Sequence, residues 1–189
     1  MTVRGIVLAA GFSSRMGAFK PLLDLCGAPV IRRTIDALRR GGVADITVVT
    51  GFSRELLLPE IADCREAYNA DFPEGMFSSV LTGFADFLTD SAELALVTPA
   101  DCPFISVPPG LLTAGERLAV PVYNNLRGHP LAVPRSFVPG ILRYSGGGGL
   151  RAAIAALPMS EVPAADEGVL LDMDYPEDAE RLRAKWLSA

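Results

Sequence analysis

A loop that combines small residues, hydroxyl groups and cations follows the first apolar run of the chain. Residues 6–8 are aliphatic and partly β-branched, as in a buried strand, and the small residues after them let backbone approach a ligand closely. Backbone N–H groups, hydroxyls and positive charge in such a loop suit phosphate groups. We therefore interpret the loop as a nucleoside triphosphate site. Its chemically relevant residues are Ala9, Ala10, Gly11, Ser13, Ser14, Arg15 and Lys20.

Two common phosphate-binding motifs do not fit this loop. The nucleotide-hydrolase loop needs two glycines five positions apart with Lys directly after the second, whereas Gly11 and Gly17 are six apart and Lys20 comes three residues later. The dinucleotide fingerprint needs Gly where this chain has Ser13. The alternative that stays open is an ordinary surface loop with incidental Ser, Gly and Arg.

Three carboxylates could add a metal ion to the same phosphates. Asp101 follows the apolar run 94–98, and Asp172 and Asp174 lie at the end of the run 169–173. Mg²⁺ prefers few protein carboxylates together with substrate phosphates, and it would neutralise charge that develops during phosphoryl-type transfer. For Asp101 the alternative is a turn-forming residue, because Asp is common in turns.

Further polar residues leave their roles open on spacing alone. The only histidine, His129, lies in a polar segment with Arg127, for which an ordinary hairpin tip is the favoured interpretation. Arg151 follows a four-glycine run and could either bind phosphate or lie solvated on a helix. Ser78 and Ser79 could either cap a helix or contact a ligand.

Alternating strands and helices are predicted to position these groups. Turn signals and hydrophobic periodicity predict strands at 6–8, 46–50, 64–68 and 94–98, with helices at 30–40, 53–61 and 79–88 between them. This alternation predicts a three-layer α/β/α Rossmann-like domain with a mostly parallel sheet. In the second half we expect strands at 119–123, 131–133 and 169–173, the second of them at an edge or bulge because of its flanking prolines. Helices are expected at 111–118, 150–157 and from 176 to 186, and Ser53 is the expected cap of the helix at 53–61.

Composition narrows the class of protein. The chain has 189 residues, half of them hydrophobic, which predicts one folded domain over residues 1–189 rather than disorder. The absence of long apolar runs and of a signal-like start leads us to expect a soluble cytoplasmic protein with no membrane partner. The net charge of −5 argues against nucleic acid as a partner. Cys26, Cys64 and Cys102 have no paired spacing, which suits a reducing compartment, and Cys102 draws interest because it follows Asp101.

Residues 8–17, LAAGFSSRMG, followed by Lys20-Pro21-Leu22, resemble the signature loop of the MobA-like nucleotidyltransferases. The branch most similar to them is the one that contains molybdenum-cofactor cytidylyltransferase. The resemblance continues, in order, in the segments 75–79 (GMFSS), 101–104 (DCPF), 127–130 (RGHP) and 172–178 (DMDYPED). It therefore extends along the whole chain.

The resemblance implies a role for each motif. Arg15 and Lys20 would stabilise phosphates, and Asp101, joined by Asp174, would bind Mg²⁺. The nucleotide-binding residues would be Leu8, Ala9, Ala10, Gly11, Ser13, Ser14, Gly17, Gly75, Ser78, Ser79 and Ala100. The acceptor-binding residues would be Arg127, Gly128, His129, Pro130 and Arg151.

The implied reaction is attack of an acceptor phosphate on the α-phosphorus of a nucleoside triphosphate, with loss of pyrophosphate. Ala10, where the guanylyltransferases usually carry Gly, favours CTP, and the implied acceptor is molybdopterin or a related phosphorylated small molecule. A molybdoenzyme or a chaperone is an implied protein partner. Three departures from the family pattern concern the acceptor half more than the nucleotide half. They are Gly147 in place of an acid, Tyr175 in place of Thr, and a short stretch 104–119. Transfer to a sugar or polyol phosphate, or nucleotide binding without catalysis, are the alternatives.

Overall fold

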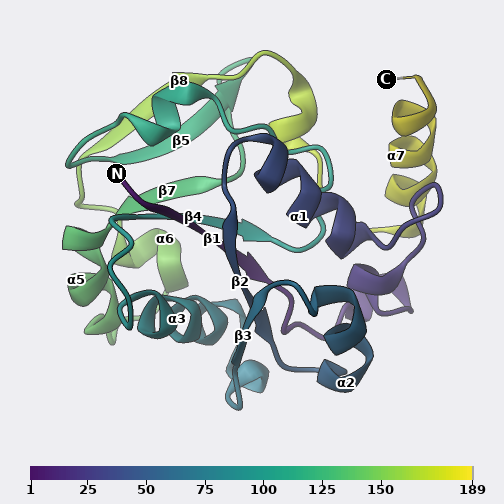
Figure 1. The fold of residues 1–189 in the computed structure, drawn as a ribbon, viewed down its shortest axis with the longest axis horizontal. Coiled ribbons are helices and arrows are strands. Elements are labelled where there is room, and N and C mark those ends of the chain that lie inside the picture. The colour runs from purple at the N-terminus through teal and green to yellow at the C-terminus, as the bar shows by residue number, and fades with distance from the viewer. Residues whose placement is uncertain (189) are drawn as a thin grey trace.

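The structure, a computed structural model, describes residues 1–188 and the side chains in that range except those of Arg15 and Ser188. Within these residues a single eight-stranded sheet has the order β3-β2-β1-β4-β7-β5-β6, with β8 paired to β5 (Figure 1). The strands are β1 Val3–Leu8, β2 Asp45–Thr50, β3 Arg65–Tyr68, β4 Leu94–Pro99, β5 Leu118–Tyr123, β6 Leu126–Arg127, β7 Leu131–Pro134 and β8 Met159–Pro163. The helices are α1 Val30–Arg40, α2 Arg54–Leu57, α3 Met76–Phe87, α4 Pro109–Leu112, α5 Val138–Leu142, α6 Gly149–Ala153 and α7 Pro176–Ser188.

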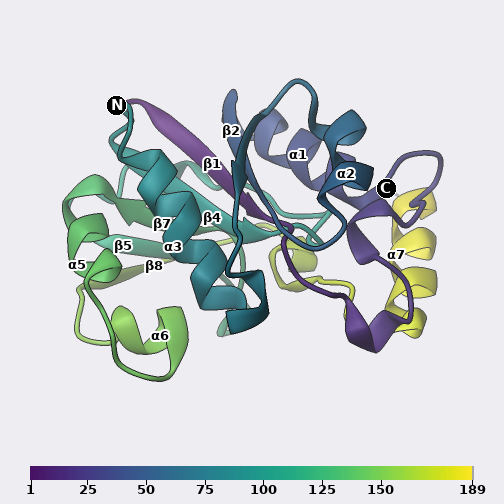
Figure 2. The same ribbon diagram turned by 90° about the horizontal axis from the view of Figure 1, so that it is seen from below.

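Helices cover both faces of the sheet, as predicted for a three-layer α/β/α fold (Figure 2). On one face α1 packs Ile31, Ile35 and Leu38 against Val7 of β1 and its neighbours. On the other face α3, α5 and α6 pack against the opposite side of the same strands, around Ile6. Strands β1, β2, β3 and β4 are parallel, and β4 is almost fully buried, which explains its continuous apolar sequence. The predicted fold class is therefore confirmed.

The second half departs from the sequence prediction in four ways. The helix predicted over 111–118 is only the short α4, Pro109–Leu112, and residue 118 already belongs to β5. Strand β7 is an interior strand between β4 and β5, and not an edge, because its prolines stand at its ends where no ladder bond is lost. Residues 169–173 are not a strand: a 3₁₀ turn, Glu167–Leu170, begins where the Asp166 carboxylate accepts a hydrogen bond from Gly168 N–H at 2.6 Å. The strand that pairs in parallel with β5 is β8, which was not predicted from the sequence.

Helix boundaries also differ near the serines. The helix predicted over 53–61 is α2 followed by a 3₁₀ turn, and Ser53 has a left-handed φ of 53° with no capping bond from its side chain. Helix α3 begins at Met76, three residues earlier than predicted, so Ser78 and Ser79 lie inside its first turn. Gly75 takes the cap position, and no side chain caps that end. The interpretation of the two serines as simple caps is therefore wrong.

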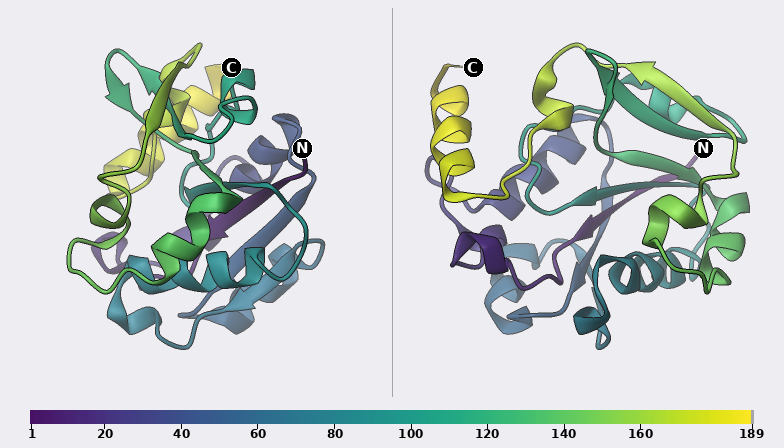
Figure 3. Two further views of the ribbon diagram at one scale, coloured as in Figure 1. Left: turned by 90° about the vertical axis from the view of Figure 1, so that its left-hand side faces the viewer. Right: turned by 180° about the vertical axis from the view of Figure 1, so that it is seen from behind.

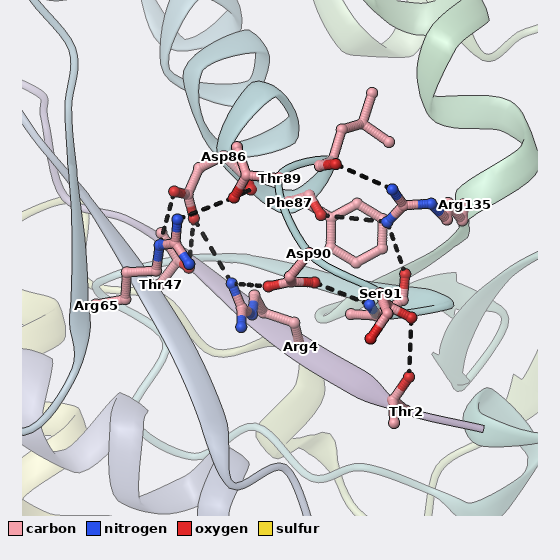
Figure 4. Close-up of polar contacts among 12 residues, drawn as sticks. Thr2, Arg4, Thr47, Arg65, Asp86, Phe87, Thr89, Asp90, Ser91 and Arg135 are labelled. Carbon is pink, nitrogen blue, oxygen red and sulfur yellow. Dashed lines mark hydrogen bonds and ion pairs between the residues drawn. The ribbon is translucent and has the colours of Figure 1, made fainter.

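A polar network fixes the carboxyl end of α3 to the sheet, at the end opposite the site described below. Figure 4 shows Arg4 of β1 paired with Asp86 and Asp90, while Arg65 of β3 also pairs with Asp86 at 2.8 Å. Arg135 donates to the Phe87 and Leu88 carbonyls at the end of the helix and to the Ala92 carbonyl in the loop after it, at 3.0 to 3.3 Å. The Phe87 and Leu88 carbonyls have no partners within the helix itself, so Arg135 acts as its carboxyl-terminal cap. The network thereby holds α3 in place.

We expect Arg135→Ala to lower the free energy of unfolding by about 2 kcal/mol, because it removes charged hydrogen bonds to three carbonyls and a stacking contact with Phe87. Urea unfolding followed by circular dichroism measures this loss. Arg143→Ala, which removes the same side chain from an exposed position, is the matched control. A loss no larger than that of the control would contradict the capping role.

Helix α7 stands apart from the main layers, beside the segment that follows β1 (Figure 3). It packs Leu182 against Leu25 and Val30, and Leu171 and Met173 join the same apolar cluster. The docking of α7 thus holds the segment 171–174 against the rest of the domain. None of the helices among residues 1–188 is long and apolar enough to cross a membrane.

Candidate functional site

A cavity of about 490 Å³ opens at the carboxyl ends of β1 and β4. These strands are adjacent and parallel, with Leu8 opposite Pro99, and the Ala100 N–H donates to the Leu8 carbonyl at 3.0 Å. Ligands of open α/β sheets bind at such a place. The predicted nucleotide-binding residues that line it are Leu8, Ala9, Ala10, Gly11, Ser13, Gly75, Ser79 and Ala100.

The backbone of the loop after β1 is held rigidly. The Ala9 N–H donates to the Val49 carbonyl at 2.9 Å, and the Ala10 carbonyl accepts from Phe52 N–H at 3.1 Å. Ala9 and Ala10 are each only 2% exposed, so the loop presents backbone rather than long side chains. Ser13 has a φ of 55°, and its hydroxyl accepts from the Lys20 N–H at 3.1 Å, which closes the loop on itself. The loop is therefore preorganised for a ligand.

Three predicted nucleotide residues lie outside the cavity lining of the described structure. Ser14 is in a 3₁₀ turn, and Gly17 ends that turn with a φ of 66° that glycine adopts without strain. The Ser78 hydroxyl donates to the carbonyls of Asp71 and Gly75 at 2.8 and 2.9 Å. The side chain of Arg15 lies outside the described part of the structure, so its predicted contact with phosphates stays a prediction.

Lys20 joins two carboxylates at the rim of the cavity. Its Nζ lies 3.1 Å from Asp101 Oδ2 and 2.6 Å from Asp174 Oδ1. The Lys20 side chain is only 12% exposed. Burial lowers the pKa of Lys20, but its hydrogen bonds and the two negative charges outweigh burial and raise that pKa. Lys20 is therefore a permanent cation at neutral pH.

The carboxylates themselves repel one another. Burial, opposed by the Lys20 charge, raises the pKa of Asp101 above its usual value. Burial also raises the pKa of Asp172, and the charges of Asp101 and Asp174 act in the same direction. Neighbouring carboxylates of this kind favour a cation close to them, and the Lys20 ammonium already takes such a position between Asp101 and Asp174.

These residues could bind a divalent ion only if substrate phosphates supplied some of its ligands. No group of three or more His, Cys, Asp and Glu side chains within the described residues is arranged to hold an ion by itself. Two carboxylates, however, are enough protein ligands for Mg²⁺ when substrate phosphates supply the other oxygens. The predicted pair Asp101 and Asp174 is brought together on Lys20. Asp101 follows strand β4 as predicted, whereas Asp174 follows a 3₁₀ turn and not the predicted strand.

His129 lies at a cavity wall and not at a hairpin tip. The turn is made by Asn124 and Asn125, both with positive φ, while the His129 N–H donates to the Val169 carbonyl at 2.7 Å. Burial lowers the pKa of His129, against the opposing charge of Asp172, and its buried Nδ1 has no partner in the described structure. A neutral imidazole thus faces the site, and the hairpin-tip interpretation is wrong because the chain folds back over Val169.

A second, mostly apolar cavity of about 330 Å³ adjoins the first. His129 lines both cavities, together with Leu8, Met76 and Pro99. The rest of its wall comes from Phe77, Val80, Val97, Leu131 and the segment 148–151. Of the predicted acceptor residues, His129 and Arg151 line this cavity.

The other predicted acceptor residues, Arg127, Gly128 and Pro130, line neither cavity. Arg127 is exposed and pairs with Glu161 at 2.8 Å, so its side chain is engaged on the surface. Gly128 packs so closely on Val169 that an added Cβ would lie 2.1 Å from its carbonyl oxygen, and Pro130 is buried. Gly128 therefore acts on the site only by letting the chain pass close to Val169.

The sequence analysis missed an aromatic rim. Phe12 and Phe72 line the first cavity, and the ring centroid of Phe12 lies 5.1 Å from that of Phe52 and 5.2 Å from that of Phe72. Each of these residues stands next to a Gly or Pro in a turn, which is the signal that could have identified them. They place apolar, flat surfaces at the mouth of the cavity.

Comparisons with known proteins find relatives that match nearly the whole chain. A molybdenum cofactor cytidylyltransferase from Escherichia coli (strain K12) is 26% identical over 182 residues, covering 92% of this chain and 91% of the relative. A crystal structure of an Rv0371c homologue from Mycobacterium sp. strain JC1 superposes with a TM-score of 0.82 at 28% identity, over 98% of this chain and 97% of that one. The structure of Rv0371c from Mycobacterium tuberculosis H37Rv in complex with manganese has a TM-score of 0.77 at 22% identity, over 97% and 99% of the two chains.

The chain spans less than half the length of the first curated relatives it matches, between 20% and 48% of each. The match to one family, in contrast, covers residues 5–162 and so includes the loop after β1, the carboxylate Asp101 and both cavities' common wall at His129. With that match added to the fold and the site, the chain belongs to the MobA-like NTP transferase domain family.

Proposed function

We propose that the protein transfers a nucleoside monophosphate, CMP by preference, from the triphosphate to a phosphorylated acceptor related to molybdopterin, with release of pyrophosphate. The observation that carries this proposal is the Lys20 ammonium between Asp101 and Asp174, at the rim of a cavity whose wall is loop backbone. Backbone, cation and paired carboxylates are the groups that phosphoryl-type transfer requires. We also propose that the whole of residues 1–189 forms this one nucleotidyltransferase domain.

The reaction needs positioning more than proton transfer. A phosphate monoester has a second pKa of about 6, so an acceptor phosphate is already a nucleophile at neutral pH. One of its oxygens attacks the α-phosphorus in line, and the bond from that phosphorus to the β-phosphate oxygen breaks. Lys20 would contact the phosphates and oppose their growing charge. Neutral His129, on the shared wall, would hydrogen-bond the acceptor phosphate as it approaches.

A divalent ion, which we propose to be Mg²⁺, would be held by Asp101 and Asp174 together with phosphate oxygens. It supplies Lewis-acid stabilisation of the triphosphate and of departing pyrophosphate. That Rv0371c, which shares this fold, has a structure in complex with manganese is in keeping with a divalent ion. The ammonium bridge in this structure supports the same position, because it is a cation between the same two carboxylates.

Ala10 supports CTP as the nucleotide. Its side chain is 2% exposed and packs beside Gly51, where an added Cβ would lie 2.8 Å from the Ala10 Cβ. Any larger residue at either position would displace the loop. Ala10 lines the first cavity, and we propose that a loop fixed in this position favours the smaller pyrimidine ring.

The second cavity supports a flat ring rather than a sugar as the acceptor. Its wall is formed mainly by Leu8, Phe77, Val80, Val97 and Leu131. The hydroxyl groups of a sugar or polyol would lose their water partners there without replacement, at a cost of about 1–3 kcal/mol each. A pterin ring presents apolar faces to such walls, and its polar edge would meet His129 and Arg151.

Pyrophosphate release with each of the four nucleoside triphosphates, Mg²⁺ and molybdopterin tests the proposal. We expect release with CTP and molybdopterin and little with mannose 1-phosphate as acceptor. Release with GTP instead of CTP would overturn the base assignment. No release with any pair, although the nucleotide binds, would favour the non-catalytic alternative.

We expect Leu131→Phe, which fills the second cavity, to raise KM for the acceptor about tenfold, corresponding to about 1.4 kcal/mol, with KM for CTP unchanged. Leu126→Phe is the matched control, because Leu126 is 60% exposed on β6. Steady-state kinetics with each substrate varied in turn measures both constants. An equal rise of both KM values would mean that the second cavity does not hold the acceptor.

A further inference from the structure

A buried amide at the far wall of the first cavity controls a hydroxyl group that lines it. Asn69 directly follows β3 and is 2% exposed, and Ser79 in the first turn of α3 is 5% exposed and lines the cavity. The Asn69 Nδ2 group donates to Ser79 Oγ at 3.1 Å and to Ser78 Oγ at 2.8 Å. Asn69 was not singled out by its sequence, because its role depends on residues ten positions away.

The orientation of this amide is fixed. The Asp71 N–H donates to Asn69 Oδ1 at 3.0 Å, and only the carbonyl oxygen of an amide can accept that bond. The NH₂ group must therefore face the two serines, and both of its hydrogens are used there. A turn in the backbone thus determines which atom of Asn69 meets Ser79.

The fixed amide in turn fixes the direction of the Ser79 hydroxyl. Because Ser79 Oγ accepts from Asn69, its own hydrogen must point to another acceptor. Within residues 1–188 no protein group accepts a hydrogen bond from Ser79 Oγ, whereas Ser78 Oγ donates to the Asp71 and Gly75 carbonyls. Of the two serines, Ser79 is therefore the one with a hydrogen available to a ligand in the cavity.

The position of Ser79 indicates which end of a nucleotide it meets. Asn69 follows β3 and Asp101 follows β4, three strand spacings apart in the order β3-β2-β1-β4, or about 14 Å. The charged pair of Lys20 and Asp101 lies on the β4 side, where phosphates would bind. Uncharged neighbours surround Ser79: Ala10, Phe72, Gly75 and Met76 also line the cavity. This uncharged wall suits the base of a nucleotide better than its phosphates.

We propose that Asn69 is a positioning residue that makes the Ser79 hydroxyl a fixed hydrogen-bond donor to an acceptor atom of the nucleobase. The inference rests on the proposed function, because it needs a nucleoside triphosphate in the cavity. The O2 and N3 atoms of cytosine are acceptors that such a donor satisfies. Asn69 itself touches no substrate and acts only through Ser79.

A double-mutant cycle on nucleotide affinity tests the proposal. Asn69→Ser keeps an oxygen for the Asp71 N–H but removes the NH₂ group, and Ser79→Ala removes the donor itself. Calorimetric titration with CTP and Mg²⁺, without acceptor, should show affinity about five- to tenfold weaker for each single variant, the value of one hydrogen bond. The double variant should be no weaker than Ser79→Ala alone, because the two changes remove the same interaction.

The matched control is Ser78→Ala. Ser78 receives the same amide group but has its hydroxyl committed to carbonyls, so Asn69→Ser should still weaken CTP binding in the Ser78→Ala background. Melting temperatures provide a second readout, since a merely structural role for Asn69 would lower stability in every background alike. Asn69→Asp, which keeps the shape and the acceptor but loses the donor, replaces Asn69→Ser if that variant does not fold.

Inorganic tripolyphosphate separates the base end from the phosphate end. Its affinity should be unchanged by Asn69→Ser, since it carries no base. Additive penalties in the cycle, or an equal loss for tripolyphosphate, would overturn the role of Asn69 while leaving nucleotidyl transfer intact. If the wild-type protein binds none of the four nucleoside triphosphates, the proposed function fails, and this inference fails with it.

Discussion

Asp101→Asn is expected to lower kcat by about a thousandfold or more while the protein stays folded. The change keeps the size of the side chain but removes one of the two carboxylates that Lys20 joins. Electrostatic groups aimed at the reacting phosphates contribute about this much to catalysis in comparable sites. Pyrophosphate release at saturating CTP and molybdopterin measures kcat, and thermal unfolding checks the fold.

Asp45→Asn is the control for this prediction. Asp45 is exposed at the start of β2, at the amino end of the sheet, whereas Asp101 follows the carboxyl end of β4. The same chemical change there should leave kcat within about twofold of the wild type, as expected of a surface substitution. Near-normal turnover of Asp101→Asn would remove this carboxylate from the metal site.

Lys20→Met is the second change with a large expected effect. Removing the ammonium should lower kcat/KM for the triphosphate by about a hundred- to thousandfold, because phosphates lose their cationic contact. The same variant should bind Mn²⁺ more tightly in the absence of nucleotide, since the ammonium no longer competes for Asp101 and Asp174. Kinetics with CTP varied and titration with Mn²⁺ alone measure the two effects.

Lys185→Met serves as the matched control, because Lys185 is the only other lysine of the sequence; it lies on α7 and pairs with Glu167. It should change neither quantity. Unchanged kinetics of Lys20→Met would mean that the loop is misinterpreted. Weaker Mn²⁺ binding by that variant would show that Lys20 supports the metal site instead of competing for it.

The first half of the fold could be predicted because its signals are local. Strands β1, β2 and β4 each contain a short run of apolar, partly β-branched residues followed by a Gly or Pro, and α1 shows helical spacing of its buried residues. Parallel strands bring their carboxyl ends together, which was enough to expect Gly11 and Asp101 near one another. Both residues do line the first cavity.

The second half could not be predicted in the same way, because long-range contacts decide it. His129 looked like a turn residue, yet its N–H pairs with Val169, forty positions away. Residues 169–173 have strand-like composition, but the Asp166 carboxylate accepts from the Gly168 N–H, and a 3₁₀ turn forms there instead. The link between Asn69 and Ser79 likewise appears only once β3 and α3 are side by side.

The transfer of label from CTP labelled on its α-phosphate to molybdopterin tests the central claim most directly. The acceptor should take up the α-phosphate in an amount equal to the pyrophosphate released, and Asp101→Asn and Lys20→Met should each slow this transfer at least a hundredfold. Release of the γ-phosphate of CTP as inorganic phosphate, with no label on the acceptor, would contradict nucleotidyl transfer at this site.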